Sequence, residues 1–445
     1  MDRASGDGRL AVEPAREGGP LVSRSRELED VSFGAALDVD GAPRVQWTAP
    51  DGLEVVGCGV AARFSATGPD RFARIRSLAE GCFADLEYDG PAASRPRAFG
   101  GLSFHADHDP VPPWQGFEAA TFVVPRIQVT RTDDGTWLTV VERSADAASE
   151  ALAHWTDRLA ELPAMRSSGT NPGIVASRRT TTREEWESGV EAALERIANG
   201  DLEKVVLAQS LTADVEEPID VAATLERLRR RYPSCYRFLV DQADDATFFG
   251  APPERLVSVH DRRVETEALA GSVPRGETPE EDETFAERLL ESEKLEREHG
   301  LVTETIRAQL EPLAREVRVA ERTIRRLATI QHLRTPIEAT LASDRHVLEL
   351  VEALHPTPAV GGLPLSAALE TIREIEPFDR GWYAAPVGWF DAAGNGEFAV
   401  AIRSGIAADD AVTLFAGNGI VADSDPAEEW EEVQLKFRPI LDELR

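Results

Sequence analysis

The pattern of apolar and polar positions along the chain mixes two periodicities. From about residue 31 to 142, short apolar runs alternate with Gly, Pro and Asp-Gly turns, which predicts strands of a mostly antiparallel sheet. Residues 71–79 and 147–162 are instead predicted to be helices. Because strands and helices mix without strict alternation, the pattern favours an α+β fold over a doubly wound parallel sheet.

The second half of the chain opens with a clearly marked helix and a buried strand. Thr182 and Glu185 form a capping box, and Asn199-Gly200-Asp201 ends the helix. A short apolar strand from Leu202 to Ala208 follows at once and carries Lys204 near its start. Further elements are expected as strands near 237–240, 247–250, 255–259, 383–390, 397–405 and 411–416, and as helices over 279–311, 344–353, 364–375 and 426–444.

Composition shifts divide the chain into three predicted segments. Residues 1–30 are polar and Gly-rich and are expected to form a flexible N-terminal end. Residues 31–170 form a first half and residues 181–445 a second half, which carries the candidate chemistry. Residues 163–180, rich in Pro, Ser, Gly, Asn, Arg and Thr, are interpreted as the linker between them.

The overall charge excludes several classes of partner. The net charge of −31 and the pI of about 4.7 argue against nucleic acid and anionic membranes, which repel such a surface. This acidity suggests adaptation to high salt, because a short Debye length weakens the self-repulsion. The sequence has no apolar run of the ~20 residues that a membrane span requires, and no signal peptide pattern. A soluble cytoplasmic protein is therefore expected.

Lysine is almost absent from the chain. Of 48 Lys and Arg residues only three are lysine, namely Lys204, Lys294 and Lys436. Arginine is always protonated, whereas lysine can lose its proton when it is buried, so only lysine can serve as a base. The three lysines could also have survived by drift. The residues beside them in the sequence therefore decide whether a chemical role is assigned to them.

Two helices combine the other lysines with carboxylates. In the final helix Glu429, Glu432 and Lys436 stand at positions i, i+3 and i+7, which places them on one face beside an apolar stripe. Glu298 follows Lys294 by four residues on an earlier helix. Carboxylates from two helices can share one Mg²⁺. The alternatives are a solvated acidic face and an ordinary ion pair within a helix.

Two Gly-bearing stretches suit the binding of an anion. Ala270-Gly271-Ser272 and Gly417-Asn418-Gly419 can each bring backbone N–H groups close to a carboxylate. Either stretch taken alone is a weak signal, because Gly-X-Gly is commonly only a turn.

In combination, these motifs resemble those of the chorismate-utilising enzymes. This family comprises isochorismate and salicylate synthases and the large subunits of anthranilate and aminodeoxychorismate synthases. The resemblance covers residues 182–445, and the first half matches only loosely. The motifs that carry it are, in chain order, Lys204-Val205-Val206-Leu207, Pro252-Pro253-Glu254-Arg255-Leu256, Leu269-Ala270-Gly271-Ser272, Ser292-Glu293-Lys294 with Glu298-His299, Gln331-His332-Leu333, Leu354-His355-Pro356-Thr357-Pro358, Glu376-Pro377-Phe378-Asp379-Arg380, Ala401-Ile402-Arg403, Phe415 to Val421, and Glu429-Trp430-Glu431-Glu432.

The resemblance implies a fold, a substrate and a cofactor. The expected fold packs large antiparallel β-sheets as a sandwich with helices on the outside. The expected substrate is chorismate, and the expected cofactor is Mg²⁺ held by Glu298, Glu429 and Glu432. The residues expected to bind the substrate are Ala270, Gly271, Ser272, His355, Thr357, Arg403, Gly417, Asn418, Gly419 and Lys436.

The resemblance also implies an activity. In members that add water at ring carbon C2, a lysine at the position of Lys204 activates the water, and Glu254 would protonate the departing C4 hydroxyl. A base of this kind requires the lysine pKa to fall from about 10.4. Glu254 must conversely keep its proton, which the apolar residues 248–252 would favour. Aminodeoxychorismate synthases carry a nucleophilic lysine where Ala270 stands, which disfavours that activity.

The favoured reading is an isochorismate synthase, an isomerase that feeds menaquinone or catechol siderophore biosynthesis and acts as a monomer with no glutaminase subunit. Three alternatives stay open. A salicylate synthase would continue by eliminating pyruvate. An anthranilate synthase large subunit would need a glutaminase partner, and its relatives typically have no lysine at position 204. A protein that only binds chorismate would not need the base and the acid.

Overall fold

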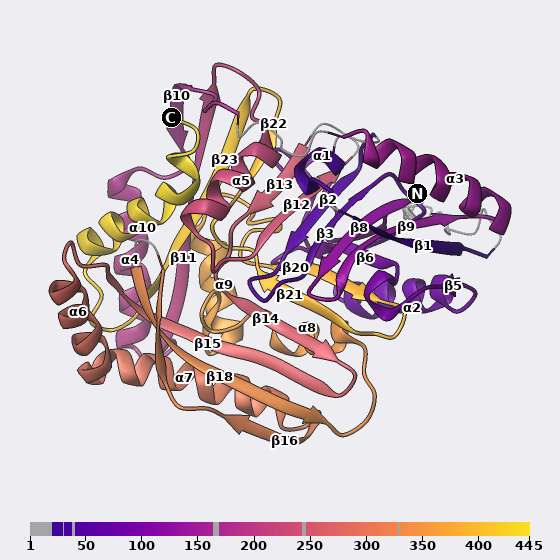
Figure 1. Ribbon diagram of the computed structural model, residues 1–445. Coiled ribbons are helices and arrows are strands. Elements are labelled where there is room, and N and C mark those ends of the chain that lie inside the picture. The colour runs from indigo at the N-terminus through magenta and orange to yellow at the C-terminus, as the bar shows by residue number, and fades with distance from the viewer. Residues whose placement is uncertain (1–19, 30, 38–40, 163–168, 243–245, 328–329) are drawn as a thin grey trace, which may run out of the picture.

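The computed structural model describes residues 20–29, 31–37, 41–162, 169–242, 246–327 and 330–445 (Figure 1). These residues form two large β-sheets, of 13 and 10 strands, together with ten α-helices. Paired strands run antiparallel, except that β1 and β5 run parallel. The expected α+β fold with large antiparallel sheets is confirmed.

The larger sheet combines strands from both halves of the chain. The contact between the halves is the pairing of β12 with β2, in which Phe238 lies opposite Trp47. The order across the sheet is β10 (Ile174–Arg179), β11 (Lys204–Val215), β23 (Ala411–Ile420), β22 (Ser404–Ala408), β13 (Ala246–Gly250), β12 (Arg237–Gln242), β2 (Arg44–Thr48), β3 (Glu54–Cys58), β8 (Ile127–Thr132), β9 (Gly135–Glu142), β1 (Val22–Leu28) and β5 (Glu87–Asp89), with β19 (Gly362–Leu363) paired to β11.

The smaller sheet joins the two halves in the same way. Its strand β20 pairs with β6, where Gly388 lies opposite Gly100. Both sheets are therefore continuous across the expected boundary between halves. The order is β16 (Ala314–Val319), β18 (Ile330–Leu341), β15 (Arg263–Pro274), β14 (Arg255–His260), β21 (Gly396–Val400), β20 (Pro386–Asp391), β6 (Arg97–Leu102), β7 (Ala120–Val124) and β4 (Ala62–Ala66), with β17 (Thr323–Arg326) paired to β18.

Helices cover the outer faces and edges of the sheets. Figure 1 shows α3, α6 and α10 at the periphery of the molecule. No helix in the described ranges is long and apolar enough to span a membrane. The helices are α1 (Phe33–Ala36), α2 (Arg71–Phe83), α3 (Ala145–Ala160), α4 (Arg183–Ala198), α5 (Val221–Arg231), α6 (Pro279–Glu291), α7 (Glu293–Leu310), α8 (Val347–Leu354), α9 (Leu365–Ile375) and α10 (Pro426–Leu441), with a short 3₁₀ helix at Ala92–Ser94.

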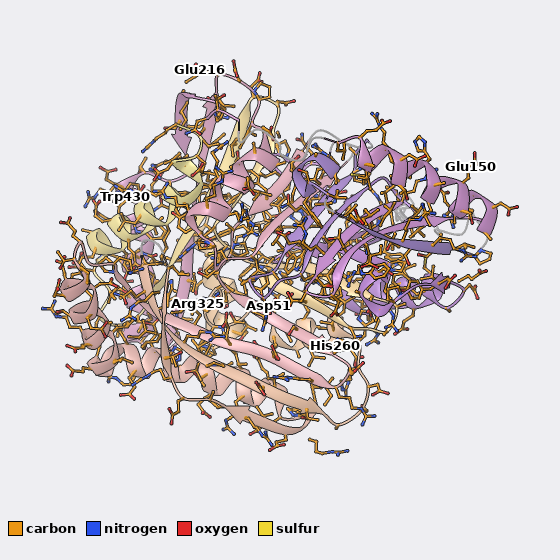
Figure 2. The ribbon with its side chains drawn as sticks, in the orientation of Figure 1. Asp51, Glu150, Glu216, His260, Arg325 and Trp430 are labelled. Atoms are coloured by element: carbon orange, nitrogen blue, oxygen red, sulfur yellow. The ribbon has the colours of Figure 1, made fainter. Side chains whose placement is uncertain are left out.

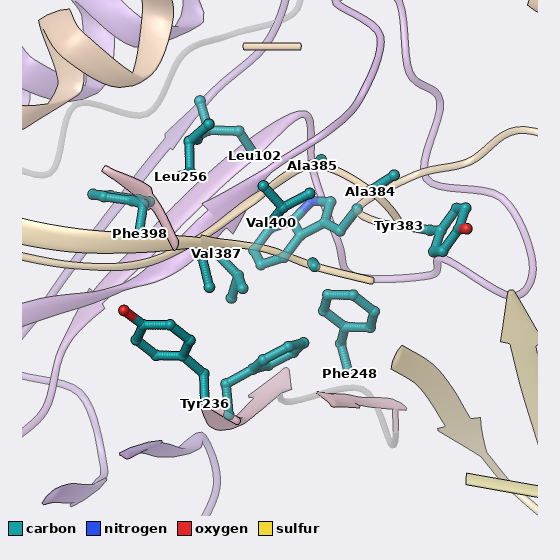
Figure 3. Close-up of a cluster of buried hydrophobic side chains, with 14 of the residues drawn as sticks. Leu102, Tyr236, Phe248, Leu256, Tyr383, Ala384, Ala385, Val387, Phe398 and Val400 are labelled. Carbon is teal, nitrogen blue, oxygen red and sulfur yellow. The ribbon is translucent and has the colours of Figure 1, made fainter. Parts of the chain in front are cut away.

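The main core is one continuous cluster of buried apolar side chains contributed by both sheets. Figure 3 shows part of it, where Leu102 from the first half lies among Val387, Phe398 and other residues of the second half. Charged side chains instead populate the outside, as Glu150 and Glu216 illustrate at two edges of the molecule (Figure 2).

Two expected elements turn out to be divided. The helix expected over 279–311 is two helices, α6 and α7, because Ser292 has an extended backbone and its side chain accepts a hydrogen bond from the backbone N–H of Leu295 at 3.3 Å. The strand expected over 397–405 is also wrong as one element. It forms β21 in the smaller sheet and β22 in the larger sheet, and Arg403 lies between them with a φ of +51°.

Several expected elements agree with the structure, and two segments are more ordered than expected. The capping box of Thr182 and Glu185 begins α4, as predicted. Within residues 1–30, residues 22–28 form β1 and pair with β9, while residues 1–19 and 30 lie outside the described part. Within 163–180, residues 174–179 form the edge strand β10, and residues 163–168 lie outside the described part.

Candidate active site

A cavity of about 340 Å³ lies in the second half of the chain, between β11, β15, β18, β23, α7 and α10. Most of the residues singled out from the sequence line it. They are Lys204, Glu254, Ala270, Gly271, Glu298, Arg403, Gly417, Gly419, Glu429, Glu432 and Lys436.

Lys204 begins β11 and is buried in the wall of this cavity. Its Nζ donates a hydrogen bond to Oε1 of Glu298 on α7, at 2.6 Å. Gly419, on the neighbouring strand β23, leaves room for the lysine. A Cβ at this position would lie 2.7 Å from Cε of Lys204 and 3.2 Å from its Nζ. The absence of a side chain at Gly419 therefore determines where the amine can lie.

Glu254 stands just before β14 and is also buried. Burial, with the nearby charge of Glu267 adding to it, raises the pKa of Glu254 to about 8, although Arg325 and Lys204 oppose the shift. Glu267 is itself buried and accepts a hydrogen bond from Arg325 at 2.7 Å. Glu254 therefore holds a proton at neutral pH, as a general acid must.

A bulge in β15 shapes another wall of the cavity. The pairing of β15 with β18 shifts register between Ala270 and Ser272, and Gly271 between them has a φ of +73°, a conformation that favours glycine. Ala270 and Gly271 both line the cavity. The side chain of Ser272 lies outside the described residues.

The loop after β23 and the helix α10 hold the last group of site residues together. Asp425 caps α10 by accepting hydrogen bonds from the backbone N–H groups of Ala427 and Glu428. Lys436 forms an ion pair with Glu432 at 2.9 Å and donates to the carbonyl oxygen of Gly417 at 3.2 Å.

Asn418 lies behind the wall and does not line the cavity. Its Oδ1 accepts a hydrogen bond from Lys436, and its Nδ2 donates to Oε2 of Glu429 at 2.9 Å. Ser424 donates to the other oxygen of Glu429 at 2.7 Å. The structure thus gives Asn418 a supporting position between two cavity residues instead of direct access to a substrate.

The three carboxylates expected to bind Mg²⁺ all line the cavity. Within the described ranges, no three Asp, Glu, His or Cys side chains lie close enough to enclose a metal ion. Burial raises the pKa of Glu429, and the neighbouring charge of Glu432 raises it further, so a cation at this point would relieve both effects. An all-oxygen donor set suits Mg²⁺, which takes one or two carboxylates and completes its coordination with substrate and water.

Two further residues expected to bind the substrate, His355 and Thr357, do not line the cavity. The imidazole of His355 lies 3.2 Å from the carbonyl oxygen of Phe104, and burial lowers its pKa to about 3. Oγ1 of Thr357 is buried without a hydrogen-bond partner among the described residues. The segment that they begin does reach the cavity, through Ala359 and Val360.

The structure adds cavity residues to which sequence reasoning gave no role. His332, Arg380, Tyr383 and Phe415 line the cavity. Burial, reinforced by the charges of Arg403 and Lys436, holds the pKa of His332 well below its usual range, so this imidazole is neutral. All four stand within or beside the sequence motifs named above, and this position could have identified them as residues of the site.

Arg403 is the cationic side chain of the wall that keeps donor capacity for a ligand. Its Nη1 is buried without a hydrogen-bond partner among the described residues, and burial lowers the pKa of the guanidinium. An unsatisfied buried donor of this kind is costly unless a ligand pairs with it. A carboxylate is the ligand that suits it best.

Comparisons with known proteins agree with this geometry. The family model described as "Chorismate binding enzyme" matches residues 14–445. The chain is 37% identical to the salicylate biosynthesis isochorismate synthase of Pseudomonas aeruginosa, over 100% of this chain and 93% of that protein. It is 34% identical to the isochorismate synthase MenF of Bacillus subtilis, over 95% of this chain and 93% of that protein.

A solved structure extends the similarity to the whole fold. The menaquinone-specific isochorismate synthase MenF of Escherichia coli superimposes with a TM-score of 0.83 at 25% identity, covering 96% of this chain and 95% of that one. The chain belongs to the family of chorismate-binding enzymes.

Proposed function

We propose that the protein is an isochorismate synthase, a Mg²⁺-dependent isomerase that interconverts chorismate and isochorismate. One observation carries the proposal: a buried lysine amine and a buried carboxylic acid that keeps its proton, Lys204 and Glu254, line the same cavity. The names of the relatives support it, since two that match nearly the whole chain are isochorismate synthases.

The anion-binding groups of the cavity match a substrate with two carboxylates. Arg403, with its unpartnered Nη1, would pair with one of them. The ammonium of Lys436 and the backbone at Gly271, Gly417 and Gly419 would contact the other. Glu298, Glu429 and Glu432 would hold Mg²⁺ after a shift of their side chains, and the bound ion would supply positive charge to neutralise the ring carboxylate.

The reaction needs one base and one acid. Lys204, once neutral, takes a proton from water, and the water oxygen forms a bond to ring carbon C2. The ring double bonds shift, the C4–oxygen bond breaks, and Glu254 gives its proton to the departing hydroxyl. Atoms and charge balance, because the proton gained by Lys204 matches the one lost by Glu254.

The proposal extends to partners and pathway. Water is the nucleophile, so no glutaminase subunit is required, and we propose that the protein acts as a monomer. Relatives include menaquinone-specific and 2,3-dihydroxybenzoate-specific isochorismate synthases, which supports a place in menaquinone or catechol siderophore biosynthesis.

Product analysis tests the proposal. Purified protein is incubated with chorismate and Mg²⁺, with and without ammonium, and the products are separated by chromatography. Isochorismate as the product supports the proposal. Salicylate together with pyruvate would assign the protein as a salicylate synthase, and anthranilate formed only with ammonium would overturn the role given to Lys204.

A further inference from the structure

Strand β11, which carries Lys204, has a gap along one of its edges. On that edge Lys204 and Val205 pair with β19, and pairing with β10 begins only at Leu211. Between these points no strand in the described ranges borders this edge of β11, whereas β23 pairs with the opposite edge throughout. The backbone groups of this stretch therefore need other partners, because they are buried.

The side chains of Glu376 and Arg380 fill the gap beside Val206 and Ala208, whereas Thr180 contacts Ser210. Nη2 of Arg380 donates to the carbonyl oxygen of Val206 at 2.7 Å. Oε1 of Glu376 accepts a hydrogen bond from the backbone N–H of Ala208 at 2.8 Å. The two side chains also pair with each other, and at most 2% of either is exposed.

The same pair reaches the segment that leads into β19. Nη1 of Arg380 donates to the carbonyl oxygen of Val360 at 2.9 Å. The next residue, Gly361, accepts a hydrogen bond from the backbone N–H of Val206 at 2.9 Å. Arg380 thus joins β11 to the segment whose continuation pairs with Lys204 itself.

Arg380 and Arg403 both line the cavity, but their donors are used differently. The guanidinium of Arg380 makes four hydrogen bonds, to Val206, Val360 and both carboxylate oxygens of Glu376. It also lies over the ring of Phe104, 4.3 Å from the centroid. A guanidinium committed in this way is a poor ligand for a substrate carboxylate.

Net stability does not by itself account for an ion pair in this place. Desolvation offsets much of the attraction in a buried pair, and apolar residues of similar volume often stabilise a fold equally well. An ion pair supplies instead directed donors and acceptors, which apolar side chains lack. Here those donors and acceptors are aimed at the strand of Lys204 and at the segment beside it.

We propose that Glu376 and Arg380 are positioning residues for Lys204. They replace the missing strand at the edge of β11 and so hold the amine at its place beside Glu298. The effect on catalysis rests on the function proposed for Lys204, whereas the effect on the position of the amine does not. The proposal adds a role for a wall arginine that is distinct from binding the substrate.

The kinetic test compares matched ion-pair variants. Glu376→Gln and Arg380→Lys each weaken the pair, and Arg380→Lys keeps the charge while losing the donors that reach three partners at once. Both should lower kcat by about tenfold or more with little change in the KM for chorismate, because small displacements of a catalytic group are costly. Glu443→Gln, which removes the partner of Arg227 away from the cavity, is the control and should leave kcat unchanged.

A spectroscopic test separates this proposal from the proposed function. Because the chain contains only three lysines, protein labelled with ¹³C at the lysine ε-carbon gives few signals, and Lys204→Arg identifies that of Lys204. The Lys204 signal should shift in Glu376→Gln and stay in place in Glu443→Gln, neither of which adds a lysine, whether or not the enzyme turns over chorismate. An unchanged Lys204 signal in a folded Glu376→Gln protein would overturn the proposal.

Discussion

The amine of Lys204 and the carboxylate of Glu298 lie 2.6 Å apart, although 94 residues separate them in the chain. Lys204 begins a strand of the larger sheet and Glu298 lies on α7, which packs against the smaller sheet, so the pair bridges the cavity wall between the two sheets. Gly419 bounds the same space from β23. The positions of Lys204, the proposed base, of Glu298, a proposed metal ligand, and of Gly419 therefore depend on one another.

Replacing the proposed base should abolish turnover without abolishing binding. Lys204→Ala and Lys204→Arg each remove the proposed base, because neither alanine nor arginine can take a proton from water, and general base catalysis contributes about 10²- to 10⁴-fold in rate. We expect a loss of this size in kcat while chorismate binding, measured by calorimetry, persists. Wild-type turnover in Lys204→Ala would contradict the base role.

The pKa of about 8 for Glu254 predicts how activity depends on pH. The acid works only while it is protonated, so kcat/KM should fall as the pH rises through about 8. Glu254→Gln cannot donate the proton and should lose about 10²- to 10⁴-fold in kcat. A profile that stays level to pH 10 would argue against Glu254 as the acid.

The same shift has a consequence for stability. The folded pKa of Glu254 is raised above its ordinary value of 4.5, so its contribution to stability is complete below pH 4.5 and is lost as the pH rises through about 8. Glu254→Gln removes this dependence. Its free energy of unfolding should therefore fall less than that of the wild type between pH 5 and 9, as denaturant titrations can show.

Adding one methyl group at Gly419 should displace the amine of Lys204. The new Cβ would lie 2.7 Å from Cε of Lys204, so the flexible end of the lysine side chain must shift to relieve the contact. We expect Gly419→Ala to lower kcat by about tenfold or more.

Two further variants control for this change. Gly81→Ala, on α2, meets nothing within 4 Å and should leave kcat unchanged. In the Lys204→Ala background, Gly419→Ala should have no additional effect on kcat. Independent, additive losses would mean that Gly419 acts through something other than Lys204.

Removal of divalent cations tests the proposed Mg²⁺ site. EDTA should abolish turnover, and added Mg²⁺ should restore it. Glu429→Gln should weaken Mg²⁺ binding, measured by calorimetry without substrate, whereas Glu443→Gln should not. Full activity after exhaustive chelation would show that turnover does not require a divalent cation.

The net charge of −31 predicts that salt stabilises the fold. The Debye length falls from ~10 Å at 0.1 M salt to ~3 Å at 1 M, so self-repulsion among surface carboxylates weakens. The melting temperature should rise with KCl. Equal stability in dilute buffer would count against adaptation to high salt.

Much of the site could be predicted because its residues fall in short motifs. Lys204 and Glu298 were marked by residue type and spacing, and Glu254 by its place in a motif of the family resemblance, and the structure brings all three to one cavity. Local patterns also indicated the capping box of Thr182 and Glu185 at the start of α4 correctly.

Other features depend on long-range contacts that spacing does not reveal. The division of 397–405 between two sheets follows from pairing with β13 and β14, which lie far away in the chain. Asn418 stands between two glycines in a stretch suited to anions, yet its amide bridges Glu429 and Lys436. Nothing in the sequence marks Glu376 and Arg380 as partners of β11, because that role needs the gap between β19 and β10.

The central claim is that water attacks ring carbon C2, and an oxygen-isotope experiment tests it most directly. The enzyme is incubated with chorismate and Mg²⁺ in water enriched in ¹⁸O, and the product is analysed by mass spectrometry with fragmentation to locate the label. The account predicts isochorismate that carries one ¹⁸O at the C2 hydroxyl, formed by the wild type and not by Lys204→Ala. Isochorismate without the label, or a product with nitrogen at C2, would contradict it.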